Sequence, residues 1–428
     1  MHTTDFINIG HTIELRNLPI EEHHSANNNT TGNDESLPPL ISAIIPCLNE
    51  ELTLGICINK AMASFTQRGV KGEVIVGDNG STDKSVEIAE SLGARVVHQP
   101  TRGYGAALSA AAGAARGKYI IMADADDSYD WSQLDCFIDT LENGADFVMG
   151  NRFAGGIEAG AMPPLHRYLG NPVMSGIARW LYRSPIRDFH CGMRGFTREA
   201  FQKIAAHSTG MEFASEMIIN AHRAELDIRE VPIKLYPDKR NRPPHLRSFR
   251  DGWRHLRLLI AYAPNIIYLV PGLILLIIGL IGLALLAGGP VQFGGYYFGI
   301  HFVALATMAT LIGLTSLLLG ILAKVAIAIS HPVPGGRLVT WLKRSHPLEW
   351  LVFLGTTLAL LGFSADLLLA FQWFFIGGSM EQSVHAAFVI STACIAGVLM
   401  SMAGFVLKLL LDNLDNAPSA ASMEGPAQ

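Results

Sequence analysis

The sequence predicts an α/β domain with a mostly parallel sheet, followed by an all-α membrane domain of four helices. Between residues 40 and 240, short apolar runs alternate with helical segments of about 10 to 15 residues, a pattern typical of βαβ units. From about Ile260 onward long apolar runs dominate, each long enough to cross about 30 Å of hydrocarbon. With 428 residues, half of them hydrophobic, the chain is long enough for both parts.

Charge, cysteine content and the ends of the chain indicate what kind of protein this is. A formal net charge of -5 gives no support for nucleic-acid binding. The five cysteines are scattered and form no Cys-x-x-Cys pair, as expected for reduced thiols in a cytosol-facing protein. No basic-then-apolar leader begins the chain, so we expect the first domain to stay on one side of the membrane. Residues 1–37 and 414–428 are expected to be flexible tails.

The α/β domain is predicted over residues 38–240. After the first strand, Asn49 is the expected cap of a helix that ends near Phe65. Two further strand–helix pairs end near Leu92 and Gly117. The predicted strands are residues 40–46, 73–78, 94–98 and 119–123.

The fourth strand ends in three carboxylates, Asp124, Asp126 and Asp127. Asp124 and Asp126 are two apart where the strand opens into a loop, so they can direct oxygens toward one point. Such a pair suits Mg²⁺ or Mn²⁺ that is also held by substrate phosphates. An isolated Asp-x-Asp is more often a solvated turn, but open α/β sheets bind ligands at the carboxyl ends of their strands. We therefore predict a metal site formed by Asp124 and Asp126.

Two neighbouring strand ends add groups that suit a nucleotide. Asp78 ends the second strand and could accept hydrogen bonds from a base or ribose, although an Asp there is often a simple cap. Arg102 with Gly103 and Gly105 at a helix start offers backbone donors and a guanidinium for a diphosphate.

The motifs occur in a fixed order along about half of the chain: Pro46–Glu50, Val76–Asp83, Arg102–Ala107, Ala123–Asp127, Met149–Phe153, Asp188–Phe196, Met211–Phe213 and Glu230–Ile233. As an ordered set they resemble family 2 inverting glycosyltransferases with the GT-A fold. The branch they resemble most is that of dolichyl-phosphate mannose synthases and bacterial polyprenyl-phosphate glucosyltransferases.

The resemblance implies a role for each matching residue. Residues that would bind the donor are Pro46, Leu48, Asn49, Glu50, Asp78, Asn79, Arg102, Gly103, Asp124 and Ala125. Catalytic residues would be Asp126, Asp188 and Arg194, and the acceptor phosphate would face Arg152, Arg167 and Arg240. The sequence differs from this branch in two places. Asp126-Asp127-Ser128 replaces the usual end of the acidic motif, which leaves open whether Asp127 joins the metal. Residues 240–244 replace the Gly-x-Ser-Lys element of the branch, which leaves the role of Arg240 at the acceptor phosphate open.

The implied activity moves one sugar, with inversion, from a UDP- or GDP-linked donor to a polyprenyl or dolichyl phosphate, supplying lipid-linked sugar for glycan or glycolipid assembly. The largest electrostatic demand is the charge on the leaving diphosphate, which a metal with Arg102 nearby would meet. A phosphate acceptor is already anionic and needs alignment by arginines. A lipid hydroxyl acceptor would need a base, for which Asp188 is the candidate. The other interpretation of Asp188 is a buried carboxylate that holds the Arg194 loop.

Two other classes fit the sequence less well. A processive polysaccharide synthase would carry Gln-x-x-Arg-Trp after the second acidic motif, whereas here Gly176 precedes Arg179-Trp180 and the pair comes before Asp188. A non-catalytic membrane scaffold or translocation protein has no physical need to retain converging charges. The sequence is compatible with a homo-oligomer and does not fix the oligomeric state.

The membrane part begins with amphipathic segments. Residues 163–182 and a juxtamembrane helix within 241–262 place arginines between apolar residues, which predicts helices at the lipid surface or, alternatively, helices packed on their own domain. The membrane domain is predicted over residues 263–413, with spans near 267–287, 298–329, 348–376 and 386–411.

The loops between spans predict the orientation. Arg337, Lys343 and Arg344 crowd the loop between the second and third spans, whereas the other two loops lack Lys and Arg. The positive-inside rule then places both termini and the catalytic domain in the cytoplasm. Asp366 lies within a span, where an ionisable group indicates either a function or a pairing contact.

Overall fold

The computed structural model describes residues 38–240, 248–330, 336–344, 347–375 and 380–415, and the chain from Pro38 onward forms one compact unit. The predicted tail at residues 1–37 lies outside the described residues, as does nearly all of the predicted C-terminal tail.

A seven-stranded sheet forms the centre of the α/β domain, in the order β3-β2-β1-β4-β6-β5-β7. β6 runs antiparallel to β4 and β5, and the other neighbouring pairs are parallel. The prediction of a mostly parallel sheet is therefore confirmed. The strands are β1 (Ile41–Cys47), β2 (Gly72–Asp78), β3 (Arg95–His98), β4 (Tyr119–Met122), β5 (Phe147–Asn151), β6 (Arg194–Thr197) and β7 (Ile228–Pro232).

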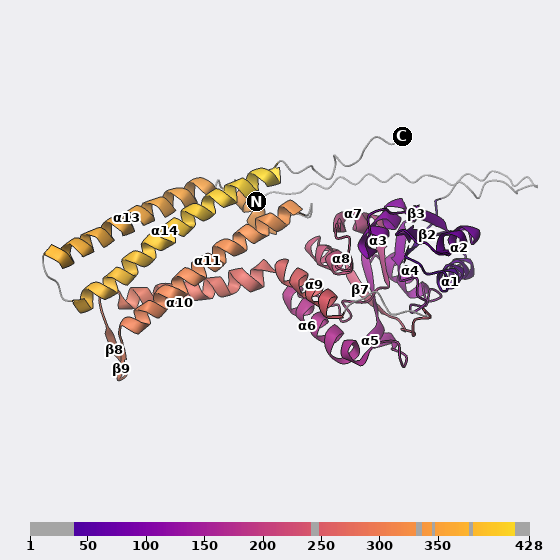
Figure 1. The fold of residues 1–428 in the computed structure, drawn as a ribbon, viewed down its shortest axis with the longest axis horizontal. Helices are drawn as coiled ribbons and strands as arrows, with labels where there is room; N and C mark the ends of the chain where they lie inside the picture. The colour runs from indigo at the N-terminus through magenta and orange to yellow at the C-terminus, as the bar shows by residue number, and fades with distance from the viewer. Residues whose placement is uncertain (1–37, 241–247, 331–335, 345–346, 376–379, 416–428) are drawn as a thin grey trace, which may run out of the picture. The chain divides into compact units, whose positions relative to one another are not determined.

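Helices cover the sheet (Figure 1). They are α1 (Leu54–Arg68), α2 (Ser85–Ser91), α3 (Tyr104–Ala114), α4 (Asp135–Glu142), α5 (Arg152–Gly155), the π-turn η1 (His166–Gly170), α6 (Asn171–Tyr182), α7 (Arg198–Ile204) and α8 (Phe213–Arg223). The alanine-rich α3 lies so close to β2 that a Cβ on Gly77 would collide with the carbonyl group of Ala107. Small residues on both elements therefore bring the start of α3 next to the carboxyl ends of the strands.

Asn49 does not cap α1, contrary to the prediction. The helix begins at Leu54, with Thr53 preceding it, and Asn49 has a positive φ of 59°. Its side-chain oxygen accepts a hydrogen bond from the backbone N–H of Thr82, at 2.7 Å. Asn tolerates this left-handed conformation, so the residue joins two loops instead of starting a helix.

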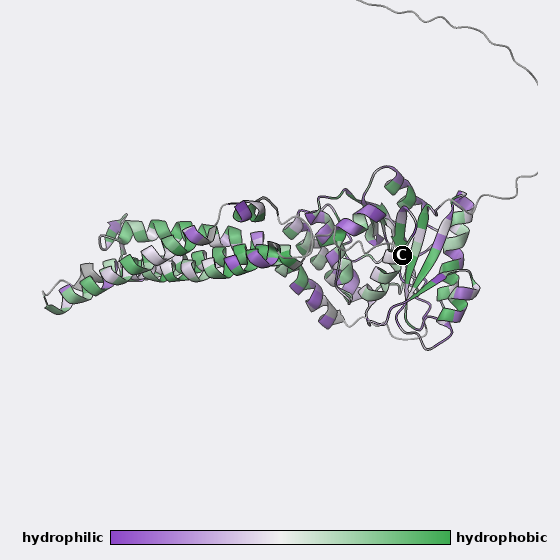
Figure 2. Cartoon of the chain, turned by 90° about the horizontal axis from the view of Figure 1, so that it is seen from above, coloured by the Kyte–Doolittle hydropathy of each residue, from purple (hydrophilic) through white to green (hydrophobic). Residues whose placement is uncertain are grey.

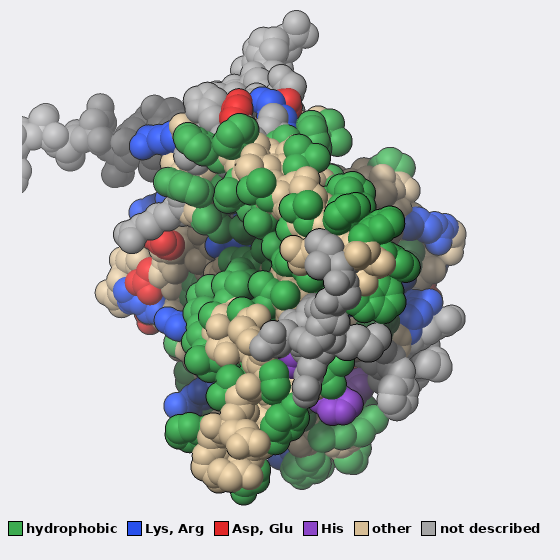
Figure 3. Space-filling model, turned by 90° about the vertical axis from the view of Figure 1, so that its left-hand side faces the viewer, with side chains coloured by type: hydrophobic (Ala, Val, Ile, Leu, Met, Phe, Trp, Pro, Cys, Tyr) green, Lys and Arg blue, Asp and Glu red, His purple; other side chains and the backbone are tan. Residues whose placement is uncertain are grey.

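The C-terminal part consists of α9 (Ser248–Ala261), the π-turn η2 (Asn265–Leu269), α10 (Val270–Leu286), α11 (Ile300–Ser330), α12 (Gly336–Arg344), α13 (Pro347–Phe375) and α14 (Met380–Asp415). Four segments are long and apolar enough to cross a membrane: Asn265–Leu286, Ile300–Ile329, Glu349–Phe375 and Val384–Leu414. Each agrees with a predicted span to within three residues at either end. In Figure 2, hydrophobic residues run along the length of these helices. Figure 3 shows the side of the molecule that lies on the left in Figure 1. This face is mostly hydrophobic, and charged side chains lie toward its edges.

Several features of this part were not predicted. A short hairpin, β8 (Val291–Phe293) and β9 (Tyr296–Phe298), joins α10 to α11, and the loop between the second and third spans contains the amphipathic α12. Asp366 accepts a hydrogen bond from the hydroxyl of Ser391 at 3.0 Å, which favours the pairing interpretation of this carboxylate.

The juxtamembrane helix is observed as α9, while residues 241–247 of the predicted segment lie outside the described residues. Its Leu259 belongs to the core of the α/β domain, and the hydroxyl of Tyr182 donates to the Leu259 carbonyl at 2.7 Å. Trp253, in contrast, is 62% exposed. One side of α9 therefore packs on the α/β domain, and the exposed tryptophan leaves another side available to lipid.

Small residues bring α13 and α14 together. A Cβ on Gly397 would lie 2.5 Å from the carbonyl oxygen of Gly355 and would also meet the backbone of Ala359. In membranes, such residues let helix backbones approach and gain van der Waals contact.

Gly397→Ala is therefore expected to destabilise the helix pair by about 1–3 kcal/mol, because the obstacle is backbone and cannot rotate away. The measurement is thermal unfolding of the purified protein in detergent. The matched control is Gly288→Ala, whose added Cβ would meet nothing within 4 Å. Equal melting temperatures for both variants would contradict the close packing.

Candidate active site

Asp124 and Asp126 follow β4 directly, as predicted, at the carboxyl end of a central strand. One oxygen of Asp124 accepts the hydroxyl of Tyr104 at 2.9 Å. Asp126 is 5% exposed, and its Oδ1 accepts the backbone N–H and the hydroxyl of Ser128 at 3.0 and 2.6 Å. Each carboxylate is thus held in one orientation by a neighbouring donor.

The two carboxylates are close enough to repel each other. Burial and the negative charge of Asp126 raise the pKa of Asp124 to about 6. A divalent cation would remove this repulsion, and hard oxygen donors suit Mg²⁺ or Mn²⁺. Among the described residues, no group of three or more His, Cys, Asp or Glu is arranged to hold a metal ion. Two carboxylates supply only part of the oxygen shell that such an ion takes, so substrate oxygens would have to complete it.

This raised pKa predicts a pH-dependent metal affinity. Metal binding requires the charged form of Asp124, whereas the metal-free protein favours the protonated form below about pH 6. We expect the apparent affinity for Mn²⁺ to fall about tenfold per pH unit below 6 and to level off above it. Electron paramagnetic resonance of free Mn²⁺ measures this. Tyr104→Phe removes a hydrogen bond that lowers this pKa, so it should move the midpoint to higher pH. An affinity that stays level down to pH 5 would rule out the coupling.

Arg240 joins this carboxylate pair. Its Nη2 lies 2.7 Å from Oδ2 of Asp126, and its Nη1 lies 3.4 Å from Oε1 of Glu50. The prediction grouped Arg240 with Arg152 and Arg167 at an acceptor phosphate, and in the structure its guanidinium lies against Asp126 and Glu50. The backbone after β7 returns to this point, since the N–H of Lys239 donates to the carbonyl of Asp126 at 3.2 Å.

Asp127 has different partners. It has a positive φ of 58°, and its two oxygens form ion pairs with Lys60 at 2.8 Å and Lys239 at 2.6 Å. Its side chain is 1% exposed. Two ammonium groups already neutralise this carboxylate, so the geometry favours a metal site of Asp124 and Asp126 without it.

The predicted nucleotide contacts surround the end of β2. Asp78 accepts the backbone N–H groups of Gly80 and Ser81 at 3.3 and 3.0 Å. Although burial acts to raise it, hydrogen bonds from Ser81 and His98 hold the pKa of Asp78 below its usual value. The carboxylate therefore stays charged at neutral pH and can accept from a ligand.

Asn79 connects two of the predicted loops. Its Nδ2 donates to the carbonyl of Thr101 at 2.8 Å, and its Oδ1 accepts the N–H of Gly103 at 2.6 Å. Gly103 has a φ of 143°, and a Cβ there would collide with the backbone of Thr209, so only glycine fits. Arg102, which lies between Thr101 and Gly103 in the sequence, is exposed. The loop thus has a fixed backbone and one solvent-facing cation, which suits a diphosphate.

Arg152 and Asp188 form a buried ion pair. Nε and Nη2 of Arg152 each lie 2.7 Å from an oxygen of Asp188, and the Arg152 N–H donates to the same carboxylate at 3.0 Å. The side chains are 9% and 0% exposed. Asp188 already accepts three hydrogen bonds, which argues against its predicted role as a base. Arg167 is partly exposed on η1, and no contact within the described part of the chain joins it to Arg152 or Arg240.

Arg194 was predicted to be catalytic, but its environment is structural. It is 1% exposed and donates to the carbonyl groups of Cys191, at 2.9 Å, and Ala214. It cross-links the loop before β6 to the start of α8. Its three guanidinium nitrogens all donate to backbone carbonyls, the third to that of Phe189 at 3.5 Å.

Comparisons with known proteins identify the family of the chain. Residues 42–205 match the model for glycosyl transferase family 2, and residues 321–411 match the model for a glycosyltransferase family 2 C-terminal transmembrane region. The low-salt glycan biosynthesis hexosyltransferase Agl6 of Haloferax volcanii is 38% identical over 388 residues, which cover 90% of this chain and 92% of that protein. The chain belongs to glycosyltransferase family 2. It is a membrane glycosyltransferase with a GT-A domain.

Two further similarities are more limited. A dolichyl-phosphate hexose transferase of Haloferax volcanii is 36% identical over 164 residues, covering 38% of this chain and 69% of that protein. Glucosyl-3-phosphoglycerate synthase from Mycobacterium tuberculosis, in a complex with Mn²⁺ and uridine diphosphate, gives a TM-score of 0.42 at 21% identity, over 52% of this chain and 78% of that one.

Several residues of the candidate site were not predicted. Tyr104 and Ser128 orient the carboxylates of Asp124 and Asp126, and Lys60 and Lys239 neutralise Asp127. Ser128 has a local signal, because Asp-x-Ser favours a turn in which the carboxylate accepts from the residue two positions on. The two lysines approach from segments far along the chain, and their spacing gives no such signal.

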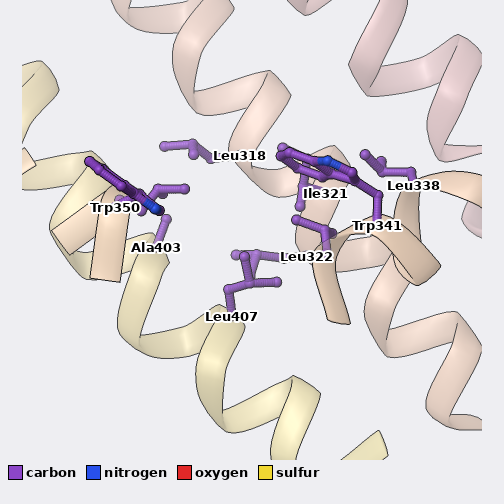
Figure 4. Close-up of a pocket in the computed structure, with 10 residues that line it drawn as sticks. Leu318, Ile321, Leu322, Leu338, Trp341, Trp350, Ala403 and Leu407 are labelled. Atoms are coloured by element: carbon purple, nitrogen blue, oxygen red, sulfur yellow. The ribbon is translucent and has the colours of Figure 1, made fainter. Parts of the chain in front are cut away.

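A cavity of about 470 Å³ lies among α11, α12, α13 and α14 (Figure 4). Ten residues line it: Leu318, Ile321, Leu322, Leu338, Trp341, Leu342, Trp350, Leu351, Ala403 and Leu407. None of them is charged, so this cavity suits hydrocarbon and cannot bind a nucleotide sugar or a metal.

Proposed function

We propose that this glycosyltransferase moves a single hexose from a UDP- or GDP-sugar to a polyprenyl or dolichyl phosphate, with inversion. The observation that supports it most is the pair of neighbouring carboxylates, Asp124 and Asp126, after β4, in a chain that continues into four apolar helices long enough to span a membrane. The names of two relatives, a hexosyltransferase and a dolichyl-phosphate hexose transferase, support the sugar and the acceptor class.

In this proposal Asp124 and Asp126 hold Mg²⁺ or Mn²⁺, which would neutralise charge on the leaving diphosphate. The backbone at Gly103 and the exposed Arg102 bind the same diphosphate, while Asp78 accepts from the nucleoside. We assign Arg240 to the donor side, because it contacts Asp126. Its guanidinium would stabilise charge on the leaving diphosphate.

The acceptor would reach the site from the membrane. Pro163, Leu165, Leu169 and Trp180, around η1 and α6, are exposed, and Arg167 lies among them. Such a surface can rest on lipid while an arginine aligns an anionic phosphate. Since the phosphate is already a nucleophile, no base is required. A hydroxyl acceptor would need one, and Asp188 is already bound by Arg152.

The proposal includes an orientation. Arg337, Lys343 and Arg344 lie on α12, between the second and third spans. By the positive-inside rule this loop, both termini and the α/β domain face the cytoplasm. Nucleotide sugars are water-soluble, so the site needs access from an aqueous compartment.

The test is a radiolabel transfer assay with purified protein in detergent. Mg²⁺ or Mn²⁺ and a panel of UDP- and GDP-sugars are supplied with either a polyprenyl phosphate or the matching polyprenol. We expect metal-dependent label in lipid only with the phosphate form. Label on the alcohol would overturn the acceptor class while leaving the metal site in place.

A further inference from the structure

A second cavity, which is polar, lies away from the carboxylates. It has a volume of about 300 Å³ and is lined by residues of α6, α8, α11 and the α9–η2 segment, among them Tyr182, His222, Arg223, Tyr262, Asn265 and Lys324. Arg223 and Lys324 are cations, and no Asp or Glu lines the cavity. None of the residues assigned above to donor, metal or acceptor lines this junction cavity.

Arg223 is the first cation of the junction cavity. It ends α8 and is partly buried, and its hydrogen bond is a long one of 3.4 Å to Oδ1 of Asn220. Burial lowers the pKa of Arg223, and only the phenols of Tyr262 and Tyr182 act in the other direction. In the portion of the chain that the structure describes, no carboxylate forms an ion pair with it. A half-buried guanidinium without a counter-charge is unfavourable unless an anion binds.

Lys324 supplies the second cation, from a different element. It lies on α11, six positions before the last residue of that helix, and its Nζ donates to Oδ1 of Asn265 at 2.9 Å. An ammonium group has three N–H donors, so it can serve a ligand as well as Asn265. Arg223 and Lys324 therefore face one cavity from α8 and from a membrane span.

His222 adds an acceptor. Its Nδ1 is 2.9 Å from the carbonyl oxygen of Ile218, which fixes the proton on Nδ1. Burial keeps the pKa of His222 below its usual value, so the ring is neutral. Its Nε2 is buried without a hydrogen-bond partner. A neutral Nε2 of this kind accepts a hydrogen bond, which a hydroxyl group can donate.

The location of the junction cavity matches the depth of lipid headgroups. The first span begins at Asn265 and the second ends at Ile329, so Asn265 and Lys324 lie near the same end of two adjacent spans. Apolar side chains, among them Leu181, Ile266 and Ile327, form one part of the lining. Lysines and arginines near span ends attract anionic headgroups, and the apolar wall can cover the start of an acyl chain.

We propose that the junction cavity binds the headgroup of an anionic phospholipid whose alcohol bears a free hydroxyl. The phosphodiester pairs with Arg223 and Lys324, and the hydroxyl donates to Nε2 of His222. This lipid is not a sugar acceptor. Its binding fixes α8 of the catalytic domain to α11 of the membrane domain.

The test measures thermal unfolding of the full-length protein in a neutral detergent with added phosphatidylglycerol, phosphatidylcholine or inorganic phosphate. We expect phosphatidylglycerol to raise the melting temperature by about 5 °C, and the other two additions to leave it nearly unchanged. An equal rise with phosphatidylcholine would show a general lipid effect, and a rise with inorganic phosphate would show a site for a free anion. Either result overturns the proposal.

Two variants make the test specific. Lys324→Gln leaves α8 untouched and should lose most of the rise in melting temperature that phosphatidylglycerol causes. The double variant with Arg223→Gln as well should lose all of this rise. The matched control is Arg179→Gln, which removes one exposed charge from α6. If the control loses as much of the rise in melting temperature, the lipid is attracted by surface charge in general and not by the junction cavity, and the proposal is overturned. Native mass spectrometry, counting bound phosphatidylglycerol in wild type and Lys324→Gln, gives the same comparison without unfolding.

Discussion

Replacing Asp126 by Ala is expected to lower kcat/KM for sugar transfer by at least about 10³-fold. The substitution removes one of the two carboxylates proposed to hold the metal. It also leaves the guanidinium of Arg240 without its 2.7 Å partner. Ser128 loses its acceptor too, but this occurs in a loop after β4, so we expect the protein to fold and insert. The measurement is the transfer assay, with thermal unfolding of the same sample.

Asp135→Asn is the control for this experiment. Asp135 begins α4, and its side chain is 60% exposed in an ion pair with Arg68. Exposed pairs of this kind contribute about 1 kcal/mol or less, so activity and stability should both remain near wild type. If Asp126→Ala transfers sugar as fast as the wild type does, the assignment of Asp126 to a metal site is wrong.

The sequence predicted those parts of the fold that depend on local pattern. The buried strand before Asp124 and the four apolar spans are continuous runs of residues, so hydropathy and periodicity define them. The β8–β9 hairpin was missed because strands of three residues are too short to show an alternation. The amphipathic α12, of nine residues, lies in a loop that was considered only for its charge.

The candidate site was predicted less completely because its contacts are long-range. Arg240 contacts Glu50 across 190 positions of sequence, and no local pattern reports such a contact. Arg194 and Arg152 are the same residue type in similar motifs, yet one binds loop carbonyls and the other a carboxylate. An arginine that binds a ligand and one that joins loops look alike until burial and partners are known.

The ion pair of Arg152 and Asp188 predicts a large and non-additive effect on stability. Both side chains are nearly fully buried, so Arg152→Met or Asp188→Leu alone leaves an uncompensated charge. Each should lower the free energy of unfolding by about 3–5 kcal/mol. The double variant replaces the pair with apolar groups and should recover most of this loss. Denaturant unfolding of the four proteins measures the coupling. Additive losses would mean that the two residues do not act as a buried pair.

The same double variant separates structure from acceptor binding. If Arg152 also aligns the lipid phosphate, the double variant will be stable yet will show a higher KM for the polyprenyl phosphate, with little change for the nucleotide sugar. With that result, Asp188 would be a positioning residue that acts through Arg152. Equal increases in both KM values would contradict an acceptor role for Arg152. The single variants cannot make this distinction, because loss of fold lowers the use of both substrates together. Only a protein that has lost the charges and kept its stability can show what Arg152 binds.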